Sequence, residues 1–85
     1  MPDRFTEKQG QYLAFIDSYV AMHGRAPAEA DLQRFFQTTP PTVHQMILKL
    51  EEKGLISRVR GEARSIKLLV SREEIPRLKR PEEVR

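Results

Sequence analysis

Two consecutive prolines, Pro40 and Pro41, follow a threonine near the middle of this 85-residue chain, and they fix where a helix can begin. Proline lacks a backbone N–H and has a locked φ, so it is tolerated in the first turn of a helix and breaks a helix further in. Thr39 is a good N-cap, because its hydroxyl can accept a backbone N–H of that first turn. The apolar residues that follow at helical spacing predict a helix over residues 40–53, ended by Gly54.

The predicted helix has an apolar side and a polar side. At about 100° per residue, one side carries Val43, Met46, Ile47 and Leu50, and we expect it to face the core. The other side and its flanks carry Pro41, Thr42, His44, Gln45, Leu48, Lys49 and Glu52. The N-terminal half of the helix therefore offers hydrogen-bonding groups without a fixed charge, whereas a helix that meets only solvent usually presents Lys and Glu there.

A first helix is predicted over residues 7–23. Thr6 and Gln9 match a capping box at its start, and Gly24 supplies a C-terminal stop. The apolar residues fall mostly at spacings of three and four, which predicts one broad buried face made of Tyr12, Leu13, Phe15, Ile16, Tyr19, Val20 and Met22.

A second helix is predicted between the first helix and the prolines. Residues 25–27 should be extended, because a residue before proline avoids helical angles, and a short strand can form there. The second helix then covers about residues 28–36, and residues 37–39 form the turn that leads into the third helix.

The C-terminal part of the chain is the more basic part. Residues 1–54 carry six basic and seven acidic groups, whereas residues 55–85 carry nine basic and five acidic groups. Residues 55–60 and 64–70 are rich in aliphatic residues, and residues 61–63 between them predict a hairpin turn. This hairpin holds four cations, Arg58, Arg60, Arg64 and Lys67. They suggest a polyanionic partner, although charges on an edge hairpin can also serve only solubility.

Composition argues against several classes of function. The chain has no cysteine and only two histidines, far apart, so we expect neither a metal site nor a cofactor. It shows no paired acids in a cleft, no nucleophile beside a base and no glycine-rich phosphate loop, so we expect no enzyme activity. Its longest apolar run is residues 12–16 and its N-terminus lacks an apolar signal core, so we expect a cytoplasmic protein without membrane contact.

The order of predicted elements is helix, short strand, helix, tight turn, helix and basic hairpin. This order predicts a winged helix-turn-helix, a mainly α fold with a small β-sheet, built from three helices and a β-hairpin wing. We expect this domain to cover residues 1–70 and a partly disordered C-terminal extension to cover residues 71–85. The wing is defined here as residues 58–67.

Three stretches of the chain follow one another in a familiar order: FTEKQGQYLAFIDSYVAMHGRAP, TPPTVHQMILKLEEKGLISR and GEARSIKLL. On these stretches, over about residues 5–70, the chain resembles the N-terminal DNA-binding domain of LexA-type repressors. The resemblance implies a winged helix-turn-helix, operator binding and transcriptional repression. It also implies base-reading positions at Thr39, Pro41, Thr42, His44 and Gln45, and wing contacts to the DNA backbone from Arg60 and Arg64.

The chain departs from the LexA pattern at three points. Phe36 stands where the family usually has the glycine of the turn, and Pro41 replaces a polar base-reading residue, so the recognised operator should differ. The chain also ends before the self-cleaving domain, which in the family supplies the protease and the main dimer contact. We therefore expect a stand-alone regulator.

Two functional hypotheses remain. The first is a sequence-specific regulator of double-stranded DNA, with DNA contacts from Thr39, Pro41, Thr42, His44, Gln45, Lys49, Arg58, Arg60, Arg64 and Lys67. Lys49 has an alternative role, because it can pair with Glu52 on the same helix. The second hypothesis is a protein-interaction or dimerisation module on the same scaffold, favoured by the outward Leu48. A homodimer is compatible with both, and the sequence does not locate its interface.

Overall fold

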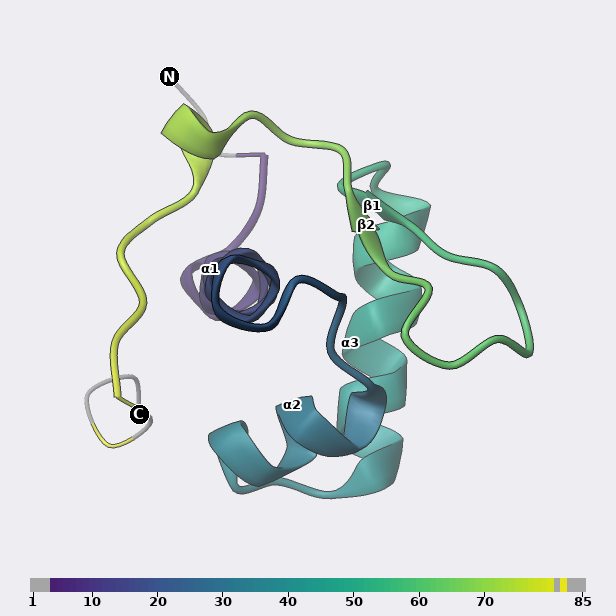
Figure 1. Cartoon of the computed structure of the whole chain (residues 1–85). Helices are drawn as coiled ribbons and strands as arrows, with labels where there is room; N and C mark the ends of the chain where they lie inside the picture. Colours follow the sequence, from purple (N-terminus) through teal and green to yellow (C-terminus); the bar gives the residue numbers. More distant parts are fainter. Residues whose placement is uncertain (1–3, 81, 83–85) are drawn as a thin grey trace.

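The computed structural model describes residues 4–80 and 82, and it folds three α-helices against a small sheet (Figure 1). The helices are α1 (Glu7–His23), α2 (Glu29–Phe36) and α3 (Pro40–Glu52). Strands β1 (Ile56–Ser57) and β2 (Lys67–Leu68) pair antiparallel, and a 3-10 helix, η1 (Arg72–Glu74), follows. The fold is a winged helix-turn-helix, as the sequence predicts.

Helix α1 begins and ends where its capping residues require. The Thr6 hydroxyl accepts the backbone N–H of Gln9 at 3.1 Å, and the Gln9 side chain accepts the backbone N–H of Thr6 at 3.0 Å. At the other end Gly24 is left-handed, with a φ of 71°, and its N–H bonds to the carbonyl of Val20 at 2.8 Å. These contacts satisfy backbone groups that would otherwise lack partners at the helix ends, and they confirm the predicted bounds.

One apolar core joins the three helices to the sheet. The rings of Tyr12 and Phe36 stack at a centroid distance of 4.2 Å and link α1 to α2. The core is formed by Tyr12, Leu13, Ile16, Leu32, Phe36, Val43, Ile47, Leu50, Leu55, Ile56 and Ile66.

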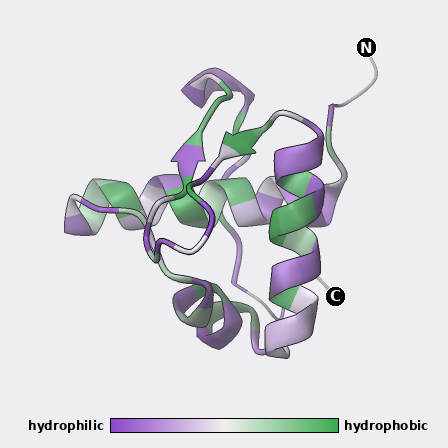
Figure 2. Cartoon of the chain, turned by 90° about the vertical axis from the view of Figure 1, so that its right-hand side faces the viewer, coloured by the Kyte–Doolittle hydropathy of each residue, from purple (hydrophilic) through white to green (hydrophobic). Residues whose placement is uncertain are grey.

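The predicted buried face of α1 is wrong at its C-terminal end. Val20 is 40% exposed and Met22 is 77% exposed. The C-terminal end of α1 projects beyond the other elements, which leaves these two side chains exposed (Figure 2). Helical periodicity shows which side of a helix is apolar, but it does not show how far the neighbouring elements extend along it.

The turn between α2 and α3 places its left-handed residue at Gln37, not at Phe36. Phe36 is the last residue of α2 and is buried, while Gln37 has a φ of 53°. The prediction that Phe36 takes the turn position that favours glycine is therefore wrong. A non-glycine residue pays a steric cost there, because its Cβ crowds the following carbonyl.

We expect Gln37→Gly to raise the free energy of unfolding by about 0.5–1 kcal/mol. Relief of the left-handed strain at Gln37 should outweigh the entropy that an additional glycine gives the unfolded chain. Thr38→Gly is the matched control, because Thr38 does not have a positive φ and its replacement should lower stability. Urea unfolding of both variants measures the difference; equal destabilisation by the two would contradict this account.

Helix α3 starts at the prolines, as predicted. Thr39 is its N-cap and accepts the backbone N–H of Thr42 at 3.4 Å, and Pro40 and Pro41 occupy the first helical positions. Val43, Ile47 and Leu50 are buried, and Met46 packs partly buried against the core. Gly54 after the helix has a φ of 75° and turns the chain toward β1.

The sheet is shorter than predicted. The predicted hairpin arms over residues 55–60 and 64–70 form ladder pairs only at Ile56 with Leu68 and at Ser57 with Lys67. The connection between them, residues 58–66, is longer than the predicted turn at residues 61–63, and it includes a turn closed by the Glu62 N–H to the Val59 carbonyl at 3.1 Å. Residues 25–27 form no strand in the described structure.

The segment after the sheet lies along α1, on the side away from α3 (Figure 1). Gln11 is 1% exposed, and its side-chain amide donates to the carbonyl of Arg77 at 3.0 Å and accepts the N–H of Lys79 at 2.7 Å. The domain boundary at residue 70 and the partial disorder beyond it stay predictions, and residues 81 and 83–85 lie outside the described residues. No helix within the described part of the chain has the length and apolar composition to cross a membrane.

Candidate nucleic-acid interface

The outward side of α3 and the wing lie side by side on one face of the molecule (Figures 1 and 2). The core contacts of Val43, Ile47 and Leu50 determine which side of α3 points outward. All six predicted site residues on or before this helix are exposed: Thr39, Pro41, Thr42, His44, Gln45 and Lys49. Leu48 is half-buried among them.

The first turn of α3 presents a pair of hydroxyls. The Oγ1 atoms of Thr39 and Thr42 lie 2.8 Å apart, so one of them donates to the other. Since the Thr39 oxygen also accepts the backbone N–H of Thr42, the pair is held in a fixed orientation. Such hydroxyls can donate to a phosphate, and they can donate to or accept from a base edge.

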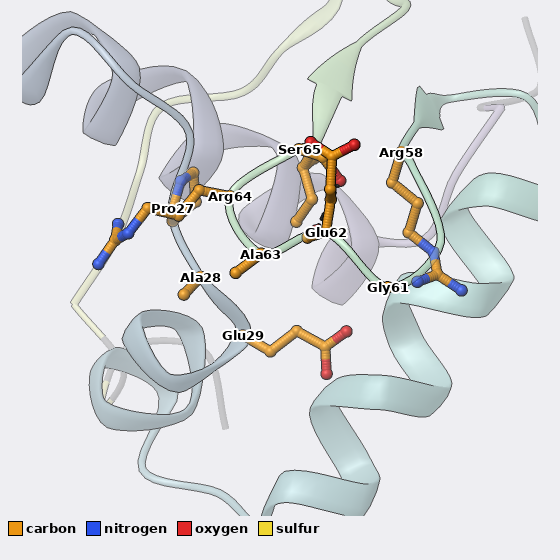
Figure 3. Close-up of a pocket in the computed structure, with 10 residues that line it drawn as sticks. Pro27, Ala28, Glu29, Arg58, Gly61, Glu62, Ala63, Arg64 and Ser65 are labelled. Carbon is orange, nitrogen blue, oxygen red and sulfur yellow. Dashed lines mark hydrogen bonds between the residues drawn. The ribbon is translucent and has the colours of Figure 1, made fainter.

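The His44 side chain contacts a carboxylate of α2. Its Nδ1 lies 3.3 Å from each carboxylate oxygen of Glu29. The Glu29 side chain points from the start of α2 toward α3 (Figure 3). The contact crosses the helix-turn-helix and restrains the imidazole at the exposed surface.

Gln45 and Lys49 border a shallow groove between α3 and the start of α1. The groove has a volume of about 430 Å³ and is also lined by Gln9, Thr42 and Met46. The Lys49 ammonium lies 3.4 Å from the Glu52 carboxylate, so the predicted pairing along the helix is present. Gln45 has no hydrogen-bond partner among the described residues, which leaves its amide free for another molecule.

The arginines of the wing fall into two groups. Arg58 donates from Nε to the Glu51 carboxylate of α3 at 3.0 Å, and its side chain is only 15% exposed. Arg64 is also bound within the domain, by acceptors on the α1–α2 side. The side chain of Arg60 at the wing tip is exposed and, like that of Lys67 in β2, makes no ion pair or hydrogen bond with any described residue. Two of the four predicted wing cations are therefore free to meet an anion.

The Arg64 contacts gather three acceptors at one nitrogen. Its Nη1 lies 3.0 Å from the Tyr19 hydroxyl, 3.3 Å from the Ala26 carbonyl and 3.1 Å from an Asp31 carboxylate oxygen. The hydrogen bond to Tyr19, and next the charge of Asp31, raise the pKa of Arg64. Arg64 is therefore positively charged, and its contacts hold the guanidinium in place.

Asp31 lies at the centre of this cluster. One of its carboxylate oxygens accepts the backbone N–H of Ala28 at 2.8 Å, and the other is 2.6 Å from Arg34. Burial alone would raise the pKa of Asp31, but the Ala28 N–H, the charges of Arg64 and Arg34 and the Tyr19 hydroxyl together lower it. The carboxylate is therefore ionised at neutral pH.

Ser65 gives the wing its shape. Its hydroxyl oxygen accepts the backbone N–H of Val59 at 2.9 Å and lies within donating distance of two carbonyls, at 3.1 Å from Val59 and 2.9 Å from Glu62. A side chain thus replaces the ladder pairs that a longer hairpin would have made.

Sequence reasoning did not identify Tyr19, Asp31, Glu51 or Ser65 as residues that build this face. Only Asp31 left a local signal, because an acid three residues after Ala28 matches half of a capping box. Tyr19 meets a residue far away in the chain, and the contacts of Glu51 and Ser65, which span three to seven residues, match no pattern that marks them in a single sequence.

A small cleft separates the wing from the start of α2 (Figure 3). Its volume is about 290 Å³, and its lining includes charges of both signs, Arg58 and Arg64 together with Glu29 and Glu62. Within residues 4–80 and 82, no group of three or more His, Cys, Asp or Glu side chains is placed to hold a metal ion.

A model of the family described as LexA DNA binding domain matches residues 3–65. Similar curated proteins include the LexA repressor of Thermosipho melanesiensis, 38% identical over 72 residues, which are 85% of this chain and 36% of the relative. The LexA repressor of Thermosipho africanus is 38% identical over 79 residues, 93% of this chain and 35% of the relative. That of Acidithiobacillus ferrooxidans is 36% identical over 73 residues, 85% of this chain and 36% of the relative. The chain thus spans about a third of the length of the curated relatives that it matches.

Proposed function

This chain belongs to the LexA DNA-binding domain family, and we propose that it binds double-stranded DNA sequence-specifically and represses transcription. The observation that carries the proposal is one face of the molecule on which α3, with its exposed polar first half, lies beside the wing, whose Arg60 is exposed. An α-helix fits the major groove, where each base pair presents a distinct edge. A neighbouring cationic loop supplies the phosphate contacts that fix register.

Helix α3 reads the bases in this proposal. Gln45 offers an amide that can pair with the donor and acceptor edge of adenine, and the hydroxyls of Thr39 and Thr42 serve bases or phosphates. Pro41 contributes an apolar surface of the kind that meets a thymine methyl group. His44 and Lys49 make further contacts along the helix. To do so, the Lys49 ammonium leaves the Glu52 carboxylate and pairs with a phosphate instead.

The wing supplies the backbone contacts. Arg60 and Lys67 bind phosphates directly, since neither has a partner among the described residues to give up. Arg58 and Arg64 stay predicted contacts that would first have to leave Glu51 and Asp31. Phosphate neutralisation by several cations makes affinity fall steeply with added salt.

A protein-interaction module is the second candidate. It is favoured by the half-buried Leu48 on the outer side of α3, by Glu52 close to the proposed DNA surface and by the exposed Met22 on α1. A homodimer fits either function, because a single helix-turn-helix reads only a few base pairs and specific sites are commonly bound as two halves.

Selection of bound duplexes from a random pool, with the oligomeric state measured alongside, tests the proposed function. We expect an enriched site that the protein binds with an affinity falling at least tenfold between low and physiological salt. An enriched inverted repeat together with two protein copies per duplex would identify the homodimer. The absence of binding to any duplex, even at low salt, would favour the interaction module.

A further inference from the structure

We infer that Arg64 is a positioning residue that anchors the wing to α1 and α2, and that it does not contact DNA phosphates itself. The inference rests on the proposed function, because it assigns a role within the same DNA-binding face. It separates two wing arginines, Arg60 and Arg64, which sequence alone treats alike.

The first argument is direction. Arg58 and Arg64 leave the wing on opposite sides, Arg64 running back past Pro27 and Arg58 reaching toward α3 (Figure 3). Arg60 lies between them in the sequence, next to Gly61 at the tip. Arg58 and Arg64 therefore attach the loop to α3 on one side and to α1 and α2 on the other. Arg60 remains as the exposed arginine of the loop.

The second argument is backbone conformation. Arg64 has a φ of 59°, in the left-handed region that side-chain-bearing residues seldom adopt. Such a conformation persists only where surrounding contacts compensate for it. The contacts to Tyr19, Ala26 and Asp31 are those that hold Arg64 there.

The third argument compares what Arg64 would lose with what it would gain. The Asp31 side chain is only 10% exposed, and it stays ionised inside a cluster of donors. Withdrawal of Arg64 to reach a phosphate would leave that carboxylate without its cation on the wing side. A phosphate contact at the surface would return little, because an exposed ion pair is weak, whereas Arg64 would give up its contacts to Tyr19, Ala26 and Asp31 together. The anchor should therefore hold while DNA is bound.

The fourth argument is the position of the anchoring groups. Tyr19 lies in the second half of α1 and Asp31 lies in α2, so neither belongs to the outward side of α3. A change at either residue leaves the outward side of α3 itself unaltered. This gives the inference a test that does not touch the DNA-binding face.

The matched pair Arg64→Gln and Arg60→Gln tests the inference, since each variant removes one wing charge. Affinity for one selected duplex is measured across a series of salt concentrations. We expect Arg60→Gln to weaken binding and to reduce the slope of log affinity against log salt by about 1, as the loss of one phosphate contact does. We expect Arg64→Gln to weaken binding about threefold to tenfold with an unchanged slope, because the phosphate contacts remain but are less well placed.

Asp31→Asn and Tyr19→Phe supply the second test. Asp31→Asn removes a negative charge from a protein that binds a polyanion, so electrostatics alone predicts tighter binding. The anchor predicts weaker binding with the slope unchanged. Tyr19→Phe changes no charge and keeps the ring, so it should fold normally even if Arg64→Gln does not, and it should weaken binding by about twofold to threefold.

Amide hydrogen exchange of residues 59–63 without DNA tests the anchor independently of the proposed function. Exchange should be faster in Arg64→Gln and Tyr19→Phe than in the unmodified chain, and unchanged in Arg60→Gln. The inference would be overturned by a slope that falls equally in the two arginine variants, or by wing exchange that does not respond to Tyr19→Phe. If no duplex binds the unmodified chain, the proposed function fails, and hydrogen exchange still decides whether Arg64 anchors the wing.

Discussion

Replacement of Ile47 by alanine should lower the free energy of unfolding by about 3 kcal/mol and the melting temperature by about 10–20 °C. Ile47 is fully buried and packs in the core through which α3 is held against the rest of the domain. Truncation removes apolar contact and leaves a cavity that a domain of 85 residues can hardly compensate for. Urea and thermal unfolding, followed by circular dichroism, measure both quantities.

Leu48→Ala is the matched control for this prediction, because Leu48 is the next residue of the same helix and is only half-buried. Its replacement should cost less than about 1 kcal/mol. If the two variants were equally stable, the side of α3 assigned to the core would be wrong, and with it the side assigned to DNA.

Gln45→Glu should weaken binding to the selected duplex by about tenfold to a hundredfold, equivalent to about 1.4–2.8 kcal/mol. The change keeps the size of the side chain, but it replaces an amide donor with a negative charge on the outward side of α3, close to the phosphates and bases in the proposed complex. Fluorescence anisotropy with a labelled duplex measures the loss, and thermal unfolding checks that the fold is intact.

Met22→Glu is the control for Gln45→Glu, since it changes net charge equally. Met22 is 77% exposed and lies near the end of α1, and this end extends away from α3 (Figure 2). Because exposed charges are screened beyond about 8–10 Å, binding should fall by less than about threefold. Equal losses in both variants would reduce the role of Gln45 to overall charge and would argue against base reading by α3.

The predictions that succeeded rest on residues with strong local preferences. Pro40 and Thr39 fixed the start of α3, Gly24 fixed the end of α1, and the Thr6–Gln9 capping box fixed its beginning. These signals act within a few residues of one another, so a single sequence contains them in full.

The predictions that failed depend on how elements and side chains meet in the fold, which local sequence preferences do not determine. Nothing near Met22 shows that α1 outruns its neighbours, and nothing near Gln37 shows that this residue, rather than Phe36, takes the left-handed turn position. The wing is a hairpin as predicted, but its paired arms are shorter than predicted, because the hydroxyl of Ser65 closes a wider loop between them. Side-chain hydrogen bonds of this kind compete with ladder pairing, and composition does not reveal which prevails.

In the candidate DNA-binding face, too, one part could be predicted from local sequence and another part could not. The exposure of the α3 residues follows from helical periodicity, so they could be placed in advance. The wing arginines could not be separated by sequence, because the partners of Arg58 and Arg64 lie in other elements. Charge density predicts that a loop is basic, whereas the fold determines which of its cations remain free.

A backbone amide NMR titration of the full chain with the selected duplex is the most direct test of the claim that α3 and the wing meet DNA together. We predict that the largest shift changes fall on residues 39–49 and 60–62 at the same DNA concentration, while the segment over residues 76–80 on the opposite side of α1 does not respond. Shift changes confined to α1 and the C-terminal segment, or changes in α3 without changes in the wing, would contradict the account.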